Sequence, residues 1–127
     1  MQKYVKNPKP EKSVRVFGRG LRISSKSSAI VCKVLTGKSL PKGQSLLEGL
    51  ISRKQNLSGK YYTNVVEELS NLLKIAEANA EFKGLSPERM FIHASAHQGF
   101  TFQTPRRFKL RGRQRKISHI QLILEQR

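Results

Sequence analysis

Aspartate and tryptophan are absent from this chain of 127 residues, and cysteine occurs only once. The single Cys32 excludes an intramolecular disulfide, which is consistent with a reducing compartment. Its neighbours are apolar, so we expect a small buried side chain rather than a reactive thiol. No apolar run approaches the roughly 18 residues that a membrane span needs, and the N-terminal residues lack the apolar stretch of a signal peptide. We therefore expect a cytoplasmic protein without membrane insertion.

Acidic residues are few, and they are unevenly placed. The chain has eight, all of them glutamate, against 25 lysines and arginines, which gives a formal net charge of +17. No acid occurs in residues 12–47 or 89–124, whereas residues 46–100 hold six glutamates against six cations. An excess of one sign on this scale opposes compaction unless a polyanion neutralises it, and nucleic acid is the obvious polyanion.

The length suits one compact domain. Residues 1–12 are rich in lysine and proline and predict a flexible basic N-terminal arm. Residues 13–127 are expected to form a single globular RNA-binding domain. A short strand over residues 13–17 is expected to end at the turn sequence Gly18-Arg19-Gly20.

Apolar residues at helical spacing predict three helices, at about 25–36, from near Pro41, and at about 63–83. Ser24 and Thr63 are the expected N-terminal caps, and Gly84 is the expected stop of the third helix. The side chains predicted to face inward in the first two helices are Ile30, Val31, Val34, Leu35, Leu46, Leu47, Leu50 and Ile51.

Two extended segments follow the third helix, at Arg89–Phe102 and Ile117–Leu124. Their alternating patterns predict paired strands. The expected fold is α+β, with three helices packed on a small three-stranded antiparallel sheet and a long protruding basic β-hairpin over about 90–124. Arms of about fifteen residues could reach ~50 Å, far beyond the ~13 Å radius of a small domain. The hairpin must therefore project and needs a partner along its length.

The tip of this hairpin, at about 105–116, is the most basic part of the chain. It contains seven cations and no acid, namely Arg106, Arg107, Lys109, Arg111, Arg113, Arg115 and Lys116. Phe100, Phe102 and Phe108 offer stacking surfaces to unpaired bases. Arginine matches phosphate oxygens through two hydrogen bonds, and Gly112 lets the backbone approach closely. This combination predicts nucleic-acid binding.

Other chemistry has little support in the sequence. Gly37-Lys38-Ser39 resembles the end of a phosphate-binding loop, but Cys32 stands where that pattern requires glycine. His93 and His97 share a strand face with His119 across the hairpin, yet the chain has too few other ligands for a metal site. Contact with bases or phosphates is the better interpretation of these histidines. No nucleophile, base and orienter occur together, so we expect no enzyme, no cofactor and no metal.

One alternative comes from the first two helices. Their short connection at Gly37–Leu40 permits a helix-turn-helix, in which the second helix enters the DNA major groove. A nucleic-acid-binding regulator of this kind is the alternative function.

Several segments resemble a known family. Leu72–Leu85 is similar to the long-helix signature of universal large-subunit ribosomal protein twenty-two, in its archaeal and eukaryotic branch. Arg111-Gly112-Arg113 resembles the hairpin-tip motif of that family, and Ser118-His119-Ile120 resembles its returning strand. Gly20–Ser24 with Lys26 resembles the entry to its first helix. The resemblance covers residues 13–125. Only four residues separate Arg113 from Ser118, fewer than in bacterial members, which predicts a different register or a bulged tip.

The resemblance implies a structural constituent of the large ribosomal subunit, located in the cytoplasm. Its partners would be large-subunit rRNA, neighbouring large-subunit ribosomal proteins and the nascent polypeptide. It implies that the protein organises several rRNA domains near the peptide exit tunnel, and that Arg111, Gly112 and Arg113 line the tunnel wall. The predicted rRNA-binding residues are Arg15, Arg19, Arg22, Lys26, Arg106, Arg107, Lys109, Arg111, Gly112, Arg113, Arg115, Lys116 and His119.

Overall fold

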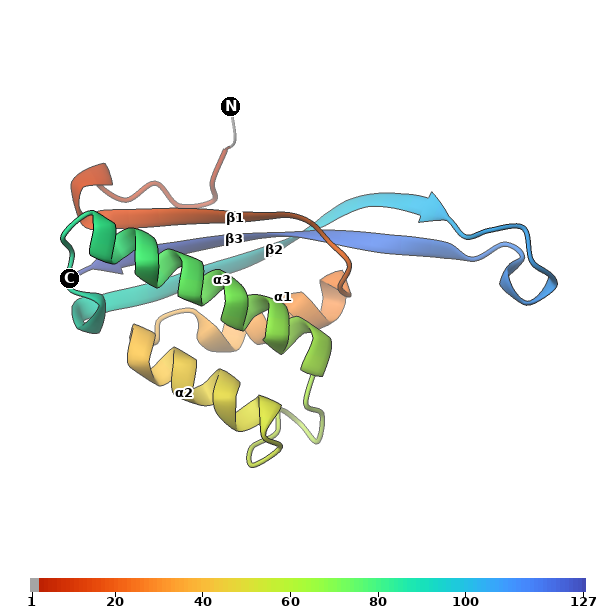
Figure 1. Ribbon diagram of the computed structural model, residues 1–127, viewed down its shortest axis with the longest axis horizontal. Helices are drawn as coiled ribbons and strands as arrows, with labels where there is room; N and C mark the ends of the chain where they lie inside the picture. Colours follow the sequence, from red (N-terminus) through yellow and green to blue (C-terminus); the bar gives the residue numbers. More distant parts are fainter. Residues whose placement is uncertain (1–2) are drawn as a thin grey trace.

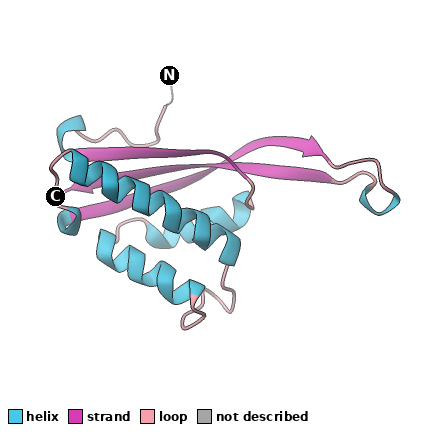
Figure 2. Ribbon diagram, in the orientation of Figure 1, coloured by secondary structure: helices cyan, strands magenta, loops and turns pink. Residues whose placement is uncertain are grey.

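The computed structural model describes residues 3–127. Three helices pack on one face of a three-stranded antiparallel sheet whose strand order is β1-β3-β2 (Figures 1 and 2). In chain order the elements are β1 (Ser13–Leu21), α1 (Ser25–Leu35), α2 (Leu40–Ile51), α3 (Thr63–Phe82), β2 (Met90–Gln103) and β3 (Gln114–Gln126). The predicted α+β fold is therefore confirmed. Among the described residues, none of the helices combines the length and apolarity that crossing a bilayer requires.

The core lies between the sheet and the helices. β3 contributes Ile120, Leu122 and Leu124, all fully buried on the inner face of the central strand. α3 packs on β1 and β3, α1 packs on β2, and α2 packs on α3. The small side chains of Ala76 and Ala80 are buried, so α3 approaches the sheet closely at these positions.

The helices begin and end close to the predicted positions, but one predicted cap and two predicted inward side chains are wrong. Ser24 does cap α1, since its hydroxyl accepts a hydrogen bond from the Ser27 amide at 3.4 Å. Thr63, however, is the first helical residue of α3, and Tyr62 occupies the cap position with a left-handed φ of 47° and no capping hydrogen bond from its side chain. Ile30 and Ile51 were expected inside but are 40% and 42% exposed. Other side chains of the same helices lie at angular positions that face the core more directly, and these are the buried ones.

β1 is longer than expected. The turn sequence Gly18-Arg19-Gly20 does not end the strand, because a bulge absorbs it and the ladder resumes with Leu21 opposite Ser118. Gly20 adopts a φ of 69°, a conformation that glycine accepts without strain. Its amide donates to Nδ1 of His119 at 3.0 Å. The sequence signal for a turn is thus a signal for a β-bulge.

The outer face of the sheet carries part of the N-terminal segment, which lies beside β1 in Figure 1. Gln121 alternates with the inward Ile120 and Leu122, so its side chain points to this outer face. Its carboxamide oxygen accepts from the Val5 amide at 3.0 Å, and its nitrogen donates to the Lys3 carbonyl at 2.7 Å. The segment is therefore bound through its backbone.

Side-chain contacts add to this attachment. The Tyr4 ring packs edge-on to Phe17, with centroids 6.4 Å apart, and the Arg15 guanidinium lies 5.3 Å from the Tyr4 centroid. Lys6 donates to Glu125 at 2.6 Å. This hydrogen bond, the largest influence on the carboxyl, lowers the pKa of Glu125 below its ordinary value.

The reactivity of Cys32 tests whether its side chain is buried in the core. It is 2% exposed, and burial raises the pKa of its thiol to about 12. Because the thiolate is the reactive form, we expect alkylation by iodoacetamide at pH 8 to be slower by orders of magnitude in the folded protein than in denaturant. Reactivity should appear only as the pH approaches 12 or as the protein unfolds. Mass spectrometry of the alkylated fraction measures this, and equal native and denatured rates would contradict the buried position.

Candidate nucleic-acid interface

β2 and β3 form a hairpin that leaves the body and extends beyond the helices (Figure 1). The ladder runs from Met90 opposite Gln126 to Gln103 opposite Gln114, with a register shift between Gln98 and Thr101. This irregularity lies in the arm rather than at the tip. The strand beyond this shift has no helix to cover it, and Phe100 and Phe102 are 64% and 41% exposed.

The tip is a folded loop. The Thr104 hydroxyl donates to the Leu110 carbonyl at 2.9 Å, and the Arg113 amide donates to the same carbonyl at 3.2 Å. A short 3-10 turn at Phe108–Leu110 and a φ of 72° at Gly112 complete the reversal. These local hydrogen bonds hold the neighbouring cations in a defined arrangement at the end of the arm.

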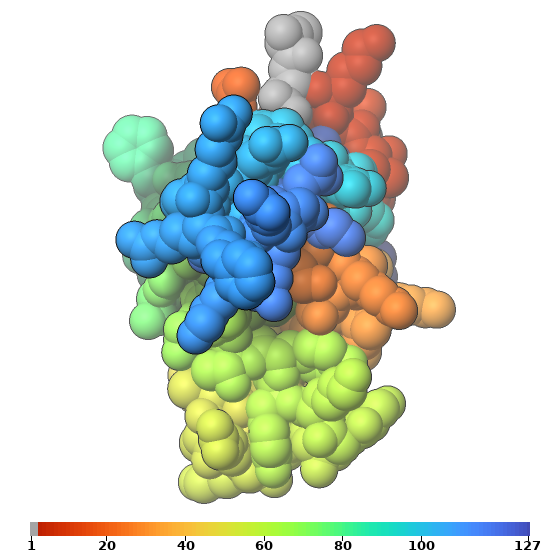
Figure 3. All heavy atoms as spheres, turned by 90° about the vertical axis from the view of Figure 1, so that its right-hand side faces the viewer, coloured from red at the N-terminus to blue at the C-terminus, as the bar shows by residue number. Residues whose placement is uncertain are grey.

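Side chains of the tip project in several directions from the end of the arm in the end-on view of Figure 3. All seven predicted cations of this region are exposed. Arg106, Arg107 and Arg111 surround a shallow hollow with Phe108, whose ring is 89% exposed. Guanidinium groups beside an open aromatic ring can bind phosphates and stack on bases at the same point.

None of these cations has an acidic partner among the residues that the structure describes. Across residues 3–127, the one ion pair joins Lys6 to Glu125, at the opposite end of the sheet from the tip. Exposed cations that cluster without acids repel one another, and an external polyanion relieves this repulsion.

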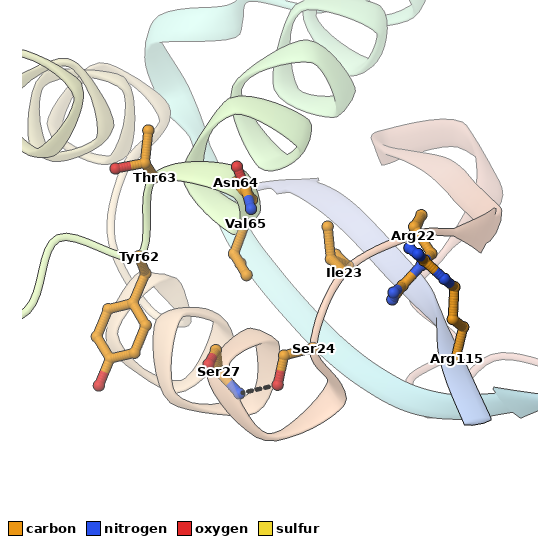
Figure 4. A pocket seen from close by; sticks show the side chains of 9 residues that line it. All are labelled: Arg22, Ile23, Ser24, Ser27, Tyr62, Thr63, Asn64, Val65 and Arg115. Carbon is orange, nitrogen blue, oxygen red and sulfur yellow. Dashed lines mark hydrogen bonds between the residues drawn. The ribbon is translucent and has the colours of Figure 1, made fainter. Parts of the chain in front are cut away.

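A second basic hollow lies at the root of the arm (Figure 4). Arg22 and Arg115 form one side of it. The Arg22 guanidinium donates from Nη1 to the Lys116 carbonyl at 3.0 Å, which fixes it against β3 beside Arg115. The other lining residues come from the starts of α1 and α3, namely Ile23, Ser24, Ser27, Tyr62, Thr63, Asn64 and Val65.

The remaining predicted residues are dispersed. Arg19 lies in the bulge of β1, and Lys26 is exposed in the first turn of α1. Arg15 lies opposite Ile123, toward the end of the sheet away from the tip, where its guanidinium contacts Tyr4. His119 accepts from Gly20 and packs on Phe17 at 5.7 Å, so it holds the bulge together. The structure therefore does not bring Arg15 together with the arm.

The match to a known protein family covers the elements that build this interface. The family model for ribosomal protein L22p/L17e matches residues 16–125, which include all three helices, the arm and the tip. The chain belongs to this family. As an L22p/L17e protein it has a structural ribosomal role, and the family expected from the sequence motifs is confirmed.

Several similar curated proteins are archaeal. The chain is 32% identical to large ribosomal subunit protein uL22 of Methanocaldococcus jannaschii, over 98% of this chain and 94% of that protein. It is 34% identical to uL22 of Methanococcoides burtonii over 76% of each chain, and 32% identical to uL22 of Methanococcus maripaludis over 98% of this chain and 96% of that one. The first alignment spans 147 positions, more than the 127 residues here, so that L22p/L17e relative contains insertions.

The packing argues against the helix-turn-helix alternative. The main packing partner of α1 is β2, and that of α2 is α3, whereas a helix-turn-helix packs its two helices on each other. Ser39, in the short connection, forms a β-bridge with Phe91 and so ties this segment to the sheet. His97 and His119 do face each other in the ladder, but residues 3–127 hold no cluster of three or more potential metal ligands.

Proposed function

We propose that this chain is a structural constituent of the large ribosomal subunit that binds large-subunit rRNA through the β2–β3 arm and its root. The observation that carries the proposal is the set of seven exposed cations at the end of a stiff arm, none with an acidic partner in the described part of the chain. The family membership gives this set its target, because the archaeal relatives are named as large-subunit proteins.

The arm acts by position and charge. Its arginines neutralise phosphates of rRNA segments that would otherwise repel one another, and the paired strands keep those contacts at fixed spacing. By binding several rRNA domains at once, the arm and the body fix the relative positions of these domains. The reaction chemistry of translation is left to other components, and no residue here is assigned a catalytic role.

The family resemblance of the tip motif and the projection of the arm beyond the helices support a finer placement. In this proposal the arm runs inward, and Arg111, Gly112 and Arg113 line the wall of the peptide exit tunnel, where they face the nascent polypeptide. The body remains outside, in contact with neighbouring large-subunit proteins. The φ of 72° at Gly112 is a conformation that glycine adopts without strain, and the absence of a side chain there lets the backbone approach a partner closely.

Co-sedimentation tests the proposal. Purified large subunits that contain a tagged copy of this chain are washed in moderate salt and pelleted. We expect the protein to stay with the subunits, because many phosphate contacts are made together. Release into the supernatant under conditions that retain other large-subunit proteins would rule out the ribosomal role. Retention on isolated DNA alone would instead favour a DNA-binding regulator.

A further inference from the structure

We propose that the hollow at the root of the arm is a nucleotide pocket, in which Arg22 and Arg115 hold a phosphate of single-stranded rRNA and Tyr62 stacks on the attached base. The inference rests on the proposed rRNA binding and adds to it a defined site where the arm joins the body, distinct from the hollow that Arg106, Arg107 and Arg111 line.

The two arginines carry the first step. Arg22 is exposed, but its hydrogen bond to the Lys116 carbonyl prevents it from swinging away from β3. Arg115 is also exposed and lines the same hollow. Among residues 3–127, neither of them has a carboxylate within ion-pair distance. Two guanidinium groups held together without an acid form an anion site, and a phosphate accepts hydrogen bonds from both.

Tyr62 provides the opposite wall. In Figure 4 its ring lies across the hollow from the arginines, with Ile23 and Val65 between them. The left-handed φ of 47° is uncommon for a bulky residue and fixes where the ring leaves the chain at the start of α3. The ring is partly buried and packs against the core, and its exposed part is a stacking surface of the kind that single-stranded bases use without regard to sequence.

Polar groups on the rim suit a nucleotide better than a free anion. Thr63 and Asn64 offer a hydroxyl and a carboxamide, which can bond to a ribose or to a base edge. A phosphate alone would satisfy only the arginine side, whereas a nucleotide spans the hollow from the guanidinium groups to the aromatic ring. Buried Ile23 and Val65 supply an apolar floor for the base.

The position of the pocket also indicates that its ligand is part of an RNA chain rather than a free nucleotide. Arg115 lies in β3, among the last cations of the basic run of the tip, so RNA bound along the arm meets this hollow next. The start of α3 lacks a capping side chain, so its free amides add positive potential on the same side. A strand of RNA can therefore contact the arm and the body without a break in positive charge.

Ultraviolet cross-linking of purified large subunits tests the pocket. Trypsin releases residues 61–74 as one peptide, and we expect mass spectrometry to find a nucleotide adduct on Tyr62 within it. Tyr62→Asn should remove this adduct, because asparagine tolerates the left-handed backbone but lacks the ring. The matched control is Tyr61→Asn, which changes the adjacent tyrosine and should leave the Tyr62 adduct in place.

Arg115→Gln gives an independent measurement that does not involve the core. This exposed residue can be replaced without loss of packing, and we expect about a tenfold loss of the Tyr62 adduct, the effect of removing one charge-assisted phosphate contact. Adducts on residues 90–106 of the arm with none on residues 61–74 would overturn the pocket while leaving the proposed rRNA binding intact. An undiminished Tyr62 adduct in Arg115→Gln would also overturn it. Loss of the protein from the subunits would count against the proposed function instead.

Discussion

Replacing both Arg111 and Arg113 with glutamate is expected to exclude the protein from large subunits, or to displace its tip, while the helical body stays folded. Both side chains are exposed at the end of the arm, and neither has an acidic partner among the described residues. A hydrogen bond to a charged group contributes roughly 1.5–3 kcal/mol. Loss of two such contacts corresponds to a weakening of about 10²-fold to 10⁴-fold, before the added repulsion between glutamate and phosphate.

The measurement compares subunit occupancy and helical circular dichroism for this variant and for Lys54→Glu with Lys60→Glu. The control pair is exposed near the end of α2, far from the arm in the chain, and changes the net charge by the same amount. We expect near-normal occupancy for the control and unchanged circular dichroism for both. Loss of the helical signal in the tip variant would show that the tip contributes to the body, and equal occupancy of the two variants would show that only total charge matters.

A single methyl group at Gly99 is expected to misdirect the whole arm. A Cβ at this position would lie 2.7 Å from the carbonyl oxygen of Ile117 and 3.1 Å from Nε2 of His119. The carbonyl belongs to the backbone of the neighbouring strand, so the clash is relieved only if the ladder shifts where the arm leaves the body. We expect Gly99→Ala to lower the free energy of unfolding by roughly 1–3 kcal/mol, as other overpacked sites do.

The functional loss should exceed this loss of stability, because a small rotation at the root moves a distant tip by several ångströms. Subunit occupancy and hydrogen exchange of the amides beyond Gly99 measure the two effects separately. Gly49→Ala is the matched control, since its Cβ would meet only the flexible end of the Gln55 side chain. That change lies within α2, where alanine is favoured over glycine, so stability should hold or rise. Full occupancy for Gly99→Ala would show that the arm tolerates a shifted root.

The sequence predicts the fold well where the pattern is local and regular. The third helix is an example, since its long apolar stripe has one period and ends at a glycine with a φ of 75°. The features that the sequence does not predict correctly depend on residues that are far away in the chain. The bulge at Gly20 exists because His119 accepts its amide, and no local pattern distinguishes it from a turn. The position of the N-terminal segment likewise depends on Gln121, whose side chain accepts from the Val5 amide although it lies more than a hundred residues away in the chain.

The candidate site also has one part that the sequence predicts and one part that only the structure reveals. The cations of the tip are neighbours in sequence, so their density alone indicates an anion-binding surface. The pocket at the root is assembled from residues 22–27, residues 62–65 and Arg115, which only the folded sheet and helices bring together. Nothing in the sequence marks Tyr62 or Asn64, because a tyrosine before a helix is ordinary and the backbone conformation that positions it is not visible in the residue types.

The Gln121 side chain has a consequence for how freely the N-terminus can vary. Its carboxamide offers one acceptor and one donor, the same pair that a peptide group offers in a β-ladder, and both are used on the main chain of residues 3 and 5. These hydrogen bonds do not depend on which side chains residues 3 and 5 carry. Mutational drift at these positions should therefore be tolerated for any residue that keeps a backbone amide at position 5, with proline as the exception, while the glutamine itself cannot be exchanged.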